Sequence, residues 1–491
     1  MKTNMPLGKT STARLALPLS ASVALVLSAC VAGPDFRAPD APPVASYTAT
    51  PVTAPVSAAQ GGGSTLMPAQ WWTLLGSAKL NALINDSVQG NRELAAAQAT
   101  LVQAQELSYA ASGARFPQIA FDASAGRDKY GAAFLGPEKL PPFNFFSLGP
   151  SLNFVLDTSG AVRRTIEEQQ ALTEAQQDQV DQTYLTLTGN VALQALAIAA
   201  THAQISTVKA LIGDDSENLR LVETAQQAGS ATEVDRLNAA SQLANDQTLL
   251  PPLEQQLHIA QHALSVLMGR YPANWTPPEF ELEDFALPDT VPLALPAELV
   301  HRRPDIRAAE AQLHAATAAV GVAAANLYPQ ITLSASASLE STTLGQLFNA
   351  SSSAGSLAGN LAAPLFDHGA LRARRRAAAA AARAALDSYE QTVLRAFAQV
   401  ADQLVALDQD AALNQAQQQA LEVSGKNLAL TRESYADGYT GILQVLEAER
   451  LNQRAQLGLV QARVGRYEDT MRLLLALGGQ APTASHTANA D

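Results

Sequence analysis

The chain has 491 residues and a formal net charge of -13; 47% of its residues are hydrophobic, but only 5% are aromatic. Nucleic-acid binding needs clustered Lys and Arg that neutralise phosphates, so the acidic balance argues against a nucleic-acid partner. Alanine supplies much of the apolar share, and such small side chains suit close helix packing better than a thick core.

The N-terminus has the pattern of a secretion signal. Lys2, Lys9 and Arg14 precede an apolar segment from Leu15 to Leu27. The segment ends in Leu27-Ser28-Ala29-Cys30, which resembles a bacterial lipobox. We therefore expect residues 1–29 to be a lipoprotein signal peptide and Cys30 to carry a diacylglycerol and an N-acyl chain. The alternative is an ordinary cysteine at the end of a hydrophobic stretch.

Two further expectations follow from this region. By the same resemblance, Val31 in place of Asp after the cysteine favours the outer membrane over the inner one. No run of about 20 apolar residues follows, so no conventional membrane-spanning helix is expected. Cys30 is the only cysteine, which excludes a disulfide within the chain.

Residues 30–70 are predicted to be an extended, lipid-anchored arm, because Pro, Ala, Ser and Thr dominate this part of the chain. Trp71 and Trp72 follow it and are interpreted as a packed anchor at the start of the first helix. A sugar-stacking pair is the alternative interpretation of the two tryptophans.

The next part, residues 71–269, is predicted to contain helices and two strands. Helical spacing from about Ser77 to Gly113 ends at an elbow, Phe116-Pro117, because proline disfavours the α region in the residue before it. Strands are expected at about 117–126 and 145–156, where apolar and polar residues alternate. The helices expected afterwards run to about Thr207, from about Asp214 to Ala228, and from Ala231 to Met268.

The same order recurs, so the chain is predicted to be an internal duplication with a period of roughly 210 residues. A proline-rich connector, 270–300, leads into a second repeat at 301–479, with an elbow at Tyr328-Pro329. Its strands are expected at about 330–340 and 355–366, and a very long helix follows them. Residues 480–491 are predicted to be a disordered tail.

The very long helix opens with the one basic cluster of the chain, formed by Arg372, Arg374, Arg375 and Arg376. We interpret the cluster as a solvated or lipid-headgroup-facing helix start rather than a nucleic-acid patch.

The predicted strands have the length that crosses a bilayer when tilted, with one apolar and one polar face. Four strands are too few to close a barrel around water, and open edges are not tolerated in lipid. Several chains are therefore expected to contribute to one barrel. The alternative is a soluble protein with two amphipathic hairpins on its surface.

The motifs are similar to those of TolC-like outer-membrane factors, specifically the NodT-type lipoproteins of resistance-nodulation-division efflux systems. The resemblance rests on the repeated element order, on both elbows and on three motifs: Gly33-Pro34-Asp35-Phe36, Trp71-Trp72 and His301-Arg302-Arg303-Pro304-Asp305. It implies a mainly α fold with membrane β: a homotrimer with a 12-stranded β-barrel that continues into a long α-helical periplasmic tunnel.

The resemblance also implies a function and a place in the cell. It implies an outer-membrane channel of a tripartite efflux pump, a passive conduit for drugs or other small molecules, with a periplasmic adaptor protein and an inner-membrane pump as partners. Two alternatives stay open: the channel of a type I protein secretion system, and a non-channel structural lipoprotein.

A gate at the periplasmic tip is implied as well. By the resemblance, Leu443 lies where related channels place an apolar gate ring, and Glu447 where they place an acidic ring. Gln444 occupies a position that is acidic in some relatives. The alternative is that Leu443 and Leu446 belong to the helix core and Glu447 to a solvated face.

No enzyme signature holds, so no catalysis, metal or cofactor is expected apart from the covalent lipid. His258 and His262 have helical i, i+4 spacing, but Ile259, Ala260 and Gln261 lie between them and the glutamate of a zinc protease is missing. Pro304 and Asp305 are interpreted as a helix start with ion pairing rather than as part of a catalytic cluster.

Overall fold

The computed structural model describes residues 31–50, 56–58, 68–129, 141–288, 290–293 and 296–478. The chain divides into two compact units. We call Met1–Ala38, Val102–Ala175 and Glu310–Ser388 the sheet unit, and Pro39–Leu101, Gln176–Ala309 and Tyr389–Asp491 the helical unit. The predicted signal peptide, Cys30 and the predicted tail lie outside the described residues.

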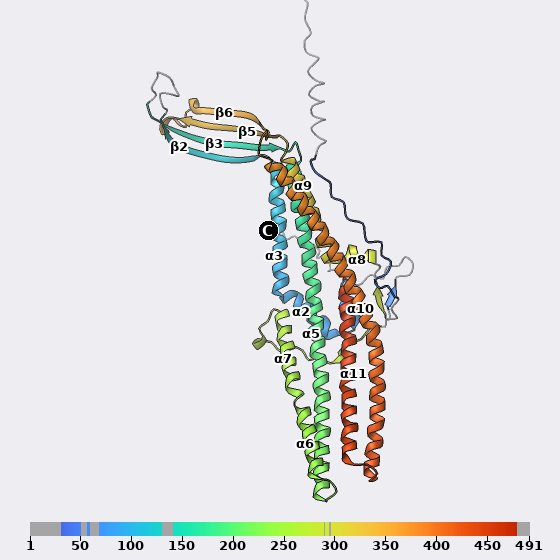
Figure 1. The fold of residues 1–491 in the computed structure, drawn as a ribbon. Coiled ribbons are helices and arrows are strands. Elements are labelled where there is room, and N and C mark those ends of the chain that lie inside the picture. The colour runs from blue at the N-terminus through green and yellow to red at the C-terminus, as the bar shows by residue number, and fades with distance from the viewer. Residues whose placement is uncertain are drawn as a thin grey trace, which may run out of the picture. The chain divides into compact units, whose positions relative to one another are not determined.

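The sheet unit contains a four-stranded antiparallel sheet in the order β2-β3-β5-β6 (Figure 1). The strands are β2 (Gln118–Asp128), β3 (Phe143–Leu156), β5 (Gln330–Ser341) and β6 (Ser353–Ala362). Each repeat supplies one hairpin, and β3 pairs with β5 to join the two hairpins. The edge strands β2 and β6 each have one hydrogen-bonded neighbour in the described part of the chain.

The register gives the sheet two different faces. On one face Ile119 lies opposite Leu152, Leu152 opposite Ala335, and Ala335 opposite Leu357. On the other face the Ser336 and Ser356 hydroxyls are 2.8 Å apart, and the Ser151 hydroxyl donates to Asp122 Oδ2 at 2.5 Å. The alternation along each strand therefore adds up to one apolar and one polar face across all four strands.

Three of the strands begin and end within two residues of the predicted positions. The predicted end of the fourth, at 366, is wrong because β6 ends at Ala362. Pro364 follows shortly afterwards, and a proline has no N–H to donate to a sheet. Leu365 and Phe366 lie beyond the strand and are 95% and 84% exposed.

The pairing between β3 and β5 is interrupted in the middle. It holds at Leu148 opposite Leu339, is absent at Gly149 and Pro150, and resumes at Ser151 opposite Ser336. Pro150 has no N–H, and the Gly149 backbone lies so close to β5 that a Cβ there would be 2.1 Å from the Ala337 carbonyl oxygen. Glycine is therefore required at 149 by close backbone approach.

The long helices α5 (Ala161–Gln227) and α10 (Ala370–Ala436) contribute residues to both units. The predicted break in α5 between Thr207 and Asp214 is wrong, because the helix is continuous. Leu211 and Asp215 are one turn apart and each is 2% exposed, so packing on this face holds the stretch helical through Gly213.

Two other predicted helices are each divided in two. The Ser77–Gly113 helix is α2 (Ala78–Gly90) and α3 (Arg92–Ser112), separated at Asn91. The Asn91 amide caps α3 by accepting from the Leu94 N–H at 2.8 Å, and it donates to the Leu267 carbonyl at 2.9 Å.

The Ala231–Met268 helix is α6 (Glu233–Gln247) and α7 (Leu250–Leu267). Pro251 and Pro252 lie in the first turn of α7, the part of a helix that tolerates the missing N–H. The remaining helices are α8 (Pro296–Arg302), α9 (Pro304–Ala325) and α11 (Ile442–Ala476).

Part of the arm and part of the connector form a small parallel sheet in the helical unit. Its strands are β1 (Val56–Ala58) and β4 (Val291–Leu293). Among the described residues, one helix is long and apolar enough by composition to cross a membrane: α5, with an 18-residue window of mean hydropathy 1.3 that is 50% buried.

The core of the helical unit begins at the two tryptophans in the 3-10 helix η1 (Trp71–Leu75). Trp71 and Trp72 are 0% and 1% exposed, and their rings meet edge to face at 6.1 Å. The Trp71 indole N–H donates to Thr188 Oγ1 on α5 at 3.3 Å, so the buried ring keeps its hydrogen bond. The two rings are the packed anchor that the sequence predicts.

Truncation at this anchor should destabilise the helical unit strongly. We expect Trp71→Ala to cost about 3–5 kcal/mol, because it leaves a cavity and removes a large buried ring. The measurement is the apparent Tm of the purified protein in detergent. Tyr271→Ala is the matched control, since Tyr271 is 80% exposed; equal shifts for the two variants would contradict the role assigned to Trp71.

Candidate functional site

The sheet is the first candidate for a functional surface, because its apolar face is uncovered. Ile119, Phe121 and Leu361 are 74%, 69% and 63% exposed. Large apolar side chains exposed on one face of a sheet are typical of a sheet with one side in lipid.

The predicted elbows lie where helices end and strands begin. Phe116 is extended, with φ -113° and ψ 152°, and β2 starts two residues later at Gln118. Tyr328 lies in a turn after α9, and β5 starts at Gln330 directly after Pro329. The Phe116 and Tyr328 rings are 68% and 56% exposed. Aromatic side chains at such positions suit the interface between lipid and water.

The residues that follow Cys30 are held against the sheet unit. The Ala32 N–H donates to the Ser159 carbonyl at 3.0 Å, and Asp35 pairs with Arg164 at 2.5 Å. The Arg164 side chain is only 5% exposed and also binds Glu167 at 2.7 Å. These contacts fix the arm to the start of α5.

A second set of contacts holds the same segment on α9. The Phe36 ring stacks on His314 at 4.4 Å, and His314 Nε2 lies 3.1 Å from Glu167. Gly33 lies so close to Gly321 that a Cβ would come within 2.4 Å of the Gly321 Cα. The Gly33-Pro34-Asp35-Phe36 motif therefore positions the chain next to Cys30 where β3 passes into α5.

The predicted gate residues lie on the exposed face at the start of α11. Leu443 is 50% exposed, and Gln444 and Glu447 are exposed as well, whereas Val445 and Ala448 are buried. The alternative interpretation is therefore wrong for Leu443, which lies outside the helix core of the single chain. Leu446 is half-buried, and the exposed Glu447 fits the solvated face that this alternative assigns to it.

Arg450 pairs with Glu447, the residue at the predicted acidic ring. Glu447 is bound by Arg450 through two hydrogen bonds, at 2.7 and 2.9 Å. The hydrogen bond from Arg450 lowers the pKa of the Glu447 carboxyl. Glu447 is therefore ionised at neutral pH, but its charge is locally balanced.

Near the start of α11 lies a largely buried polar cluster that joins helices from both repeats. Glu449 on α11 is 4% exposed and pairs with Arg432 on α10 at 2.7 Å; Asn218 on α5 also donates to it. Asp215 on α5 is 2% exposed and accepts a hydrogen bond from the Gln453 amide at 2.9 Å. The cluster ties α5 and α10 to α11, the helix of the predicted gate.

The Asp215 carboxyl is only partly satisfied. Its Oδ2 has no donor in the described structure, and Asp246 on α6 is its acidic neighbour. Burial, and then the neighbouring carboxyl of Asp246, raises the pKa of Asp215 to about 7. Asp410 on α10 is similar, since burial and Asp469 raise its pKa to about 6.

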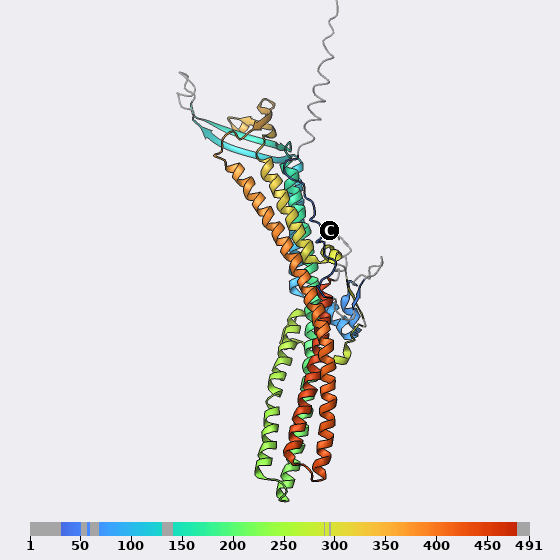
Figure 2. The same cartoon turned by 45° about the vertical axis from the view of Figure 1, so that its right-hand side comes forward.

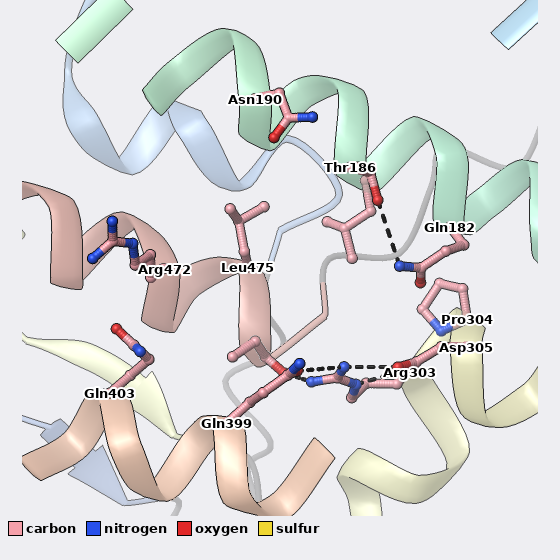
Figure 3. Close-up of a pocket in the computed structure, with 12 residues that line it drawn as sticks. Gln182, Thr186, Asn190, Arg303, Pro304, Asp305, Gln399, Gln403, Arg472 and Leu475 are labelled. Carbon is pink, nitrogen blue, oxygen red and sulfur yellow. Dashed lines mark hydrogen bonds and ion pairs between the residues drawn. The ribbon is translucent and has the colours of Figure 1, made fainter. Parts of the chain in front are cut away.

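The predicted charged helix start is a buried structural joint. Arg303 binds Asp305 at 2.7 and 3.0 Å, donates to the Ala476 carbonyl at 2.8 Å and to Gln399 at 2.9 Å. Figure 3 shows these contacts at one side of a pocket of about 350 Å³, with Gln403 and Arg472 opposite. All three nitrogens of the Arg303 guanidinium donate hydrogen bonds within the chain. The residue therefore joins the start of α9 to α10 and α11 and is a structural residue rather than a ligand-binding one.

No group of three or more His, Cys, Asp or Glu side chains among the described residues could hold a metal ion. The His258 and His262 rings lie side by side at 6.4 Å, and His258 Nδ1 contacts Gln261 at 3.2 Å.

The sequence reasoning missed Arg164, Asp215 and Glu449. Each is a charged residue in a polar helical stretch, where the sequence pattern does not distinguish a buried position from a solvated one. A weak signal exists for Asp215, because it lies one turn after the apolar Leu211.

The raised pKa of Asp215 gives a pH prediction. In the folded state the Asp215 carboxyl stays protonated up to about pH 7, whereas in the unfolded chain it ionises near pH 3.8. The free energy of unfolding therefore falls as the pH rises from about 3.8 to about 7. We expect Asp215→Asn to raise the apparent Tm at pH 8 and to change it little at pH 4, where the carboxyl is protonated in the folded state and is only beginning to ionise in the unfolded chain. Asp214→Asn is the matched control, and an equal shift at both pH values for Asp215→Asn would contradict the assignment.

Comparisons with known proteins agree with this geometry. The model of the outer membrane efflux protein family matches residues 83–270 and 295–479, the two repeats. The chain is 34% identical over 419 residues to the pyoverdine export outer membrane protein OpmQ of Pseudomonas aeruginosa, covering 84% of this chain and 87% of that protein. It is 28% identical over 472 residues to nodulation protein T of Rhizobium leguminosarum bv. viciae, covering 94% and 92%.

Among solved structures, the outer-membrane channel OprN is similar, with 30% identity, a TM-score of 0.86, and coverage of 92% of this chain and 100% of that one. The predicted fold class, mainly α with membrane β, is therefore confirmed, and so is the resemblance on which it rested. The chain belongs to the outer membrane efflux protein family and is a non-enzymatic channel protein of the cell outer membrane.

Proposed function

We propose that the protein is the homotrimeric outer-membrane conduit of a tripartite efflux pump, anchored by lipid on Cys30 and gated at the turn between α10 and α11. One observation carries the proposal: a single chain presents a four-stranded sheet with one apolar face and two unpaired edges among the described residues. Unpaired edges are costly in lipid, so copies of the sheet join edge to edge.

The family supports three copies, which makes a barrel of twelve strands from four in each chain. The relatives support small molecules as cargo. OpmQ is a pyoverdine export protein, and a further relative, 28% identical over 472 residues, is the solvent efflux pump outer membrane protein SrpC of Pseudomonas putida. A periplasmic adaptor and an inner-membrane pump are the partners that complete such a system.

The gate follows from the exposed start of α11. In a trimer, three copies of Leu443 at a constriction exclude water, and Glu447 with Arg450 sets the charge beside it. Gln444 adds a neutral polar position. The pair of the exposed Arg432 with the buried Glu449 holds α11 to α10, so a movement of α11 away from α10 breaks this pair.

The conduit is tested by conductance in planar bilayers. We expect trimers of the native protein to give a small conductance and Leu443→Ser/Glu447→Ala to raise it several-fold, because the apolar constriction is lost. The matched control is Val234→Ser/Asn238→Ala at the corresponding turn of the first repeat, where Val234 is 64% exposed. Unchanged conductance in the first variant removes the gate assignment, and a monomer without conductance removes the channel.

The membrane location of the sheet is tested by cysteine labelling in whole cells. Ile119→Cys and Leu152→Cys should resist a water-soluble maleimide, since the apolar face lies in lipid. Ser124→Cys and Ser336→Cys on the polar face are the controls and should react. Labelling of both faces would indicate a non-channel structural lipoprotein. Export of a polypeptide in place of small molecules would indicate a type I secretion channel.

A further inference from the structure

The first turns of α10 carry an unusual concentration of positive charge. Between Asp367 and Asp387 the sequence has five arginines and no acidic residue, although the whole chain has a net charge of -13. Four of them are Arg372, Arg374, Arg375 and Arg376, and the fifth is Arg383. All five are exposed. We call Arg372, Arg374, Arg375 and Arg376 the arginine cluster.

The arginine cluster lacks partners within the described part of the chain. None of its side chains makes a hydrogen bond or an ion pair there. The nearest carboxylate in the sequence, Asp367, is occupied as a helix cap: it accepts from the Leu371 N–H at 2.7 Å and from the Gly369 N–H at 2.9 Å. Arg372 acts on Asp367 only through its charge.

The position of these charges is unfavourable for the helix alone. The N-terminus of a helix carries a partial positive charge, which repels cations in the first turns. Four arginines there, without counter-charge from the described chain, are therefore best explained by an anionic partner from outside it. The arginine cluster is charge-complementary to such a partner, whereas the acidic remainder of the protein repels it.

The surroundings of the arginine cluster identify the kind of anion. The segment 363–369 joins it to β6, and Figure 2 shows α10 beginning beside the end of the sheet. Leu365 and Phe366, in this segment, are 95% and 84% exposed. Large apolar side chains next to cations match the boundary between acyl chains and headgroups, where arginines contact phosphate.

We propose that the arginine cluster and the adjoining Leu365 and Phe366 bind anionic phospholipid headgroups at the periplasmic surface of the outer membrane. The apolar pair enters the acyl region, and the guanidinium groups donate to the phosphate oxygens, which they match in geometry. This binding fixes how deep in the membrane the junction between β6 and α10 lies. The inference depends on the membrane location of the sheet but on neither the gate nor the cargo.

The test measures lipids retained by the purified trimer in native mass spectrometry. Short-chain phosphatidylglycerol and phosphatidylcholine are added in equal amounts. We expect the native protein to retain more phosphatidylglycerol. Because each arginine near a membrane surface contributes on the order of fivefold, the combined Arg372→Gln/Arg374→Gln/Arg375→Gln/Arg376→Gln variant should lose at least about tenfold of that preference.

Two control variants separate charge from folding. Replacing the same four arginines by Lys keeps the charge and should keep most of the preference. Replacing Arg92, Arg395, Arg454 and Arg463 by Gln removes four other exposed arginines and should leave the preference unchanged. Each variant is also checked for its oligomeric state and for its conductance.

Three outcomes would overturn the proposal. An unchanged lipid preference in the cluster Gln variant excludes headgroup binding there. Loss of the trimer in that variant assigns the arginines to a contact between protomers. If inorganic phosphate, added in a separate sample, displaces the bound phosphatidylglycerol completely, the arginines bind phosphate and do not require a lipid. If the proposed channel function is wrong but the lipid site is real, the native protein shows no conductance and still prefers phosphatidylglycerol.

Discussion

The structure depends on the backbone hydrogen bonds of four strands that one chain cannot complete. Within the described residues the antiparallel order β2-β3-β5-β6 satisfies the inner strands and leaves one edge of β2 and one of β6 without a neighbour. In water such edges are a risk, and in lipid they are prohibitive, because no solvent replaces the missing partners. The proposed edge-to-edge pairing with further copies would supply these missing partners.

Paired charges and ring contacts hold segments in place within each of the two units. Arg164 binds Asp35 and Glu167, and Phe36 stacks on His314, so the arm beside Cys30 is held where the strands meet the helices. In the helical unit, Glu449 and Asp215 link α5, α10 and α11 next to the exposed start of α11, where we propose the gate. Buried charges of this kind destabilise a fold unless they are paired, and pairing across helices gives these helices a defined arrangement.

Much of the architecture was predictable from the sequence because its signals are local. The alternation of apolar and polar residues located the strands, and the Phe116-Pro117 and Tyr328-Pro329 elbows marked where helices stop. The errors also have local causes. The predicted end of β6 is too late because Pro364 cannot donate to a sheet. The predicted break between Thr207 and Asp214 is wrong because the packing of Leu211 and Asp215 holds α5 together.

The sequence by itself determined the element types, the duplication, the two-faced strands and the family, since each depends on periodicity or on a contiguous motif. Only the tertiary structure decided which charged residues are buried and paired. Arg164, Asp215 and Glu449 resemble their solvated neighbours in the sequence, and they differ only because segments more than a hundred residues away cover them. Burial of a charge is a property of long-range packing, and no local pattern in a polar helix records it.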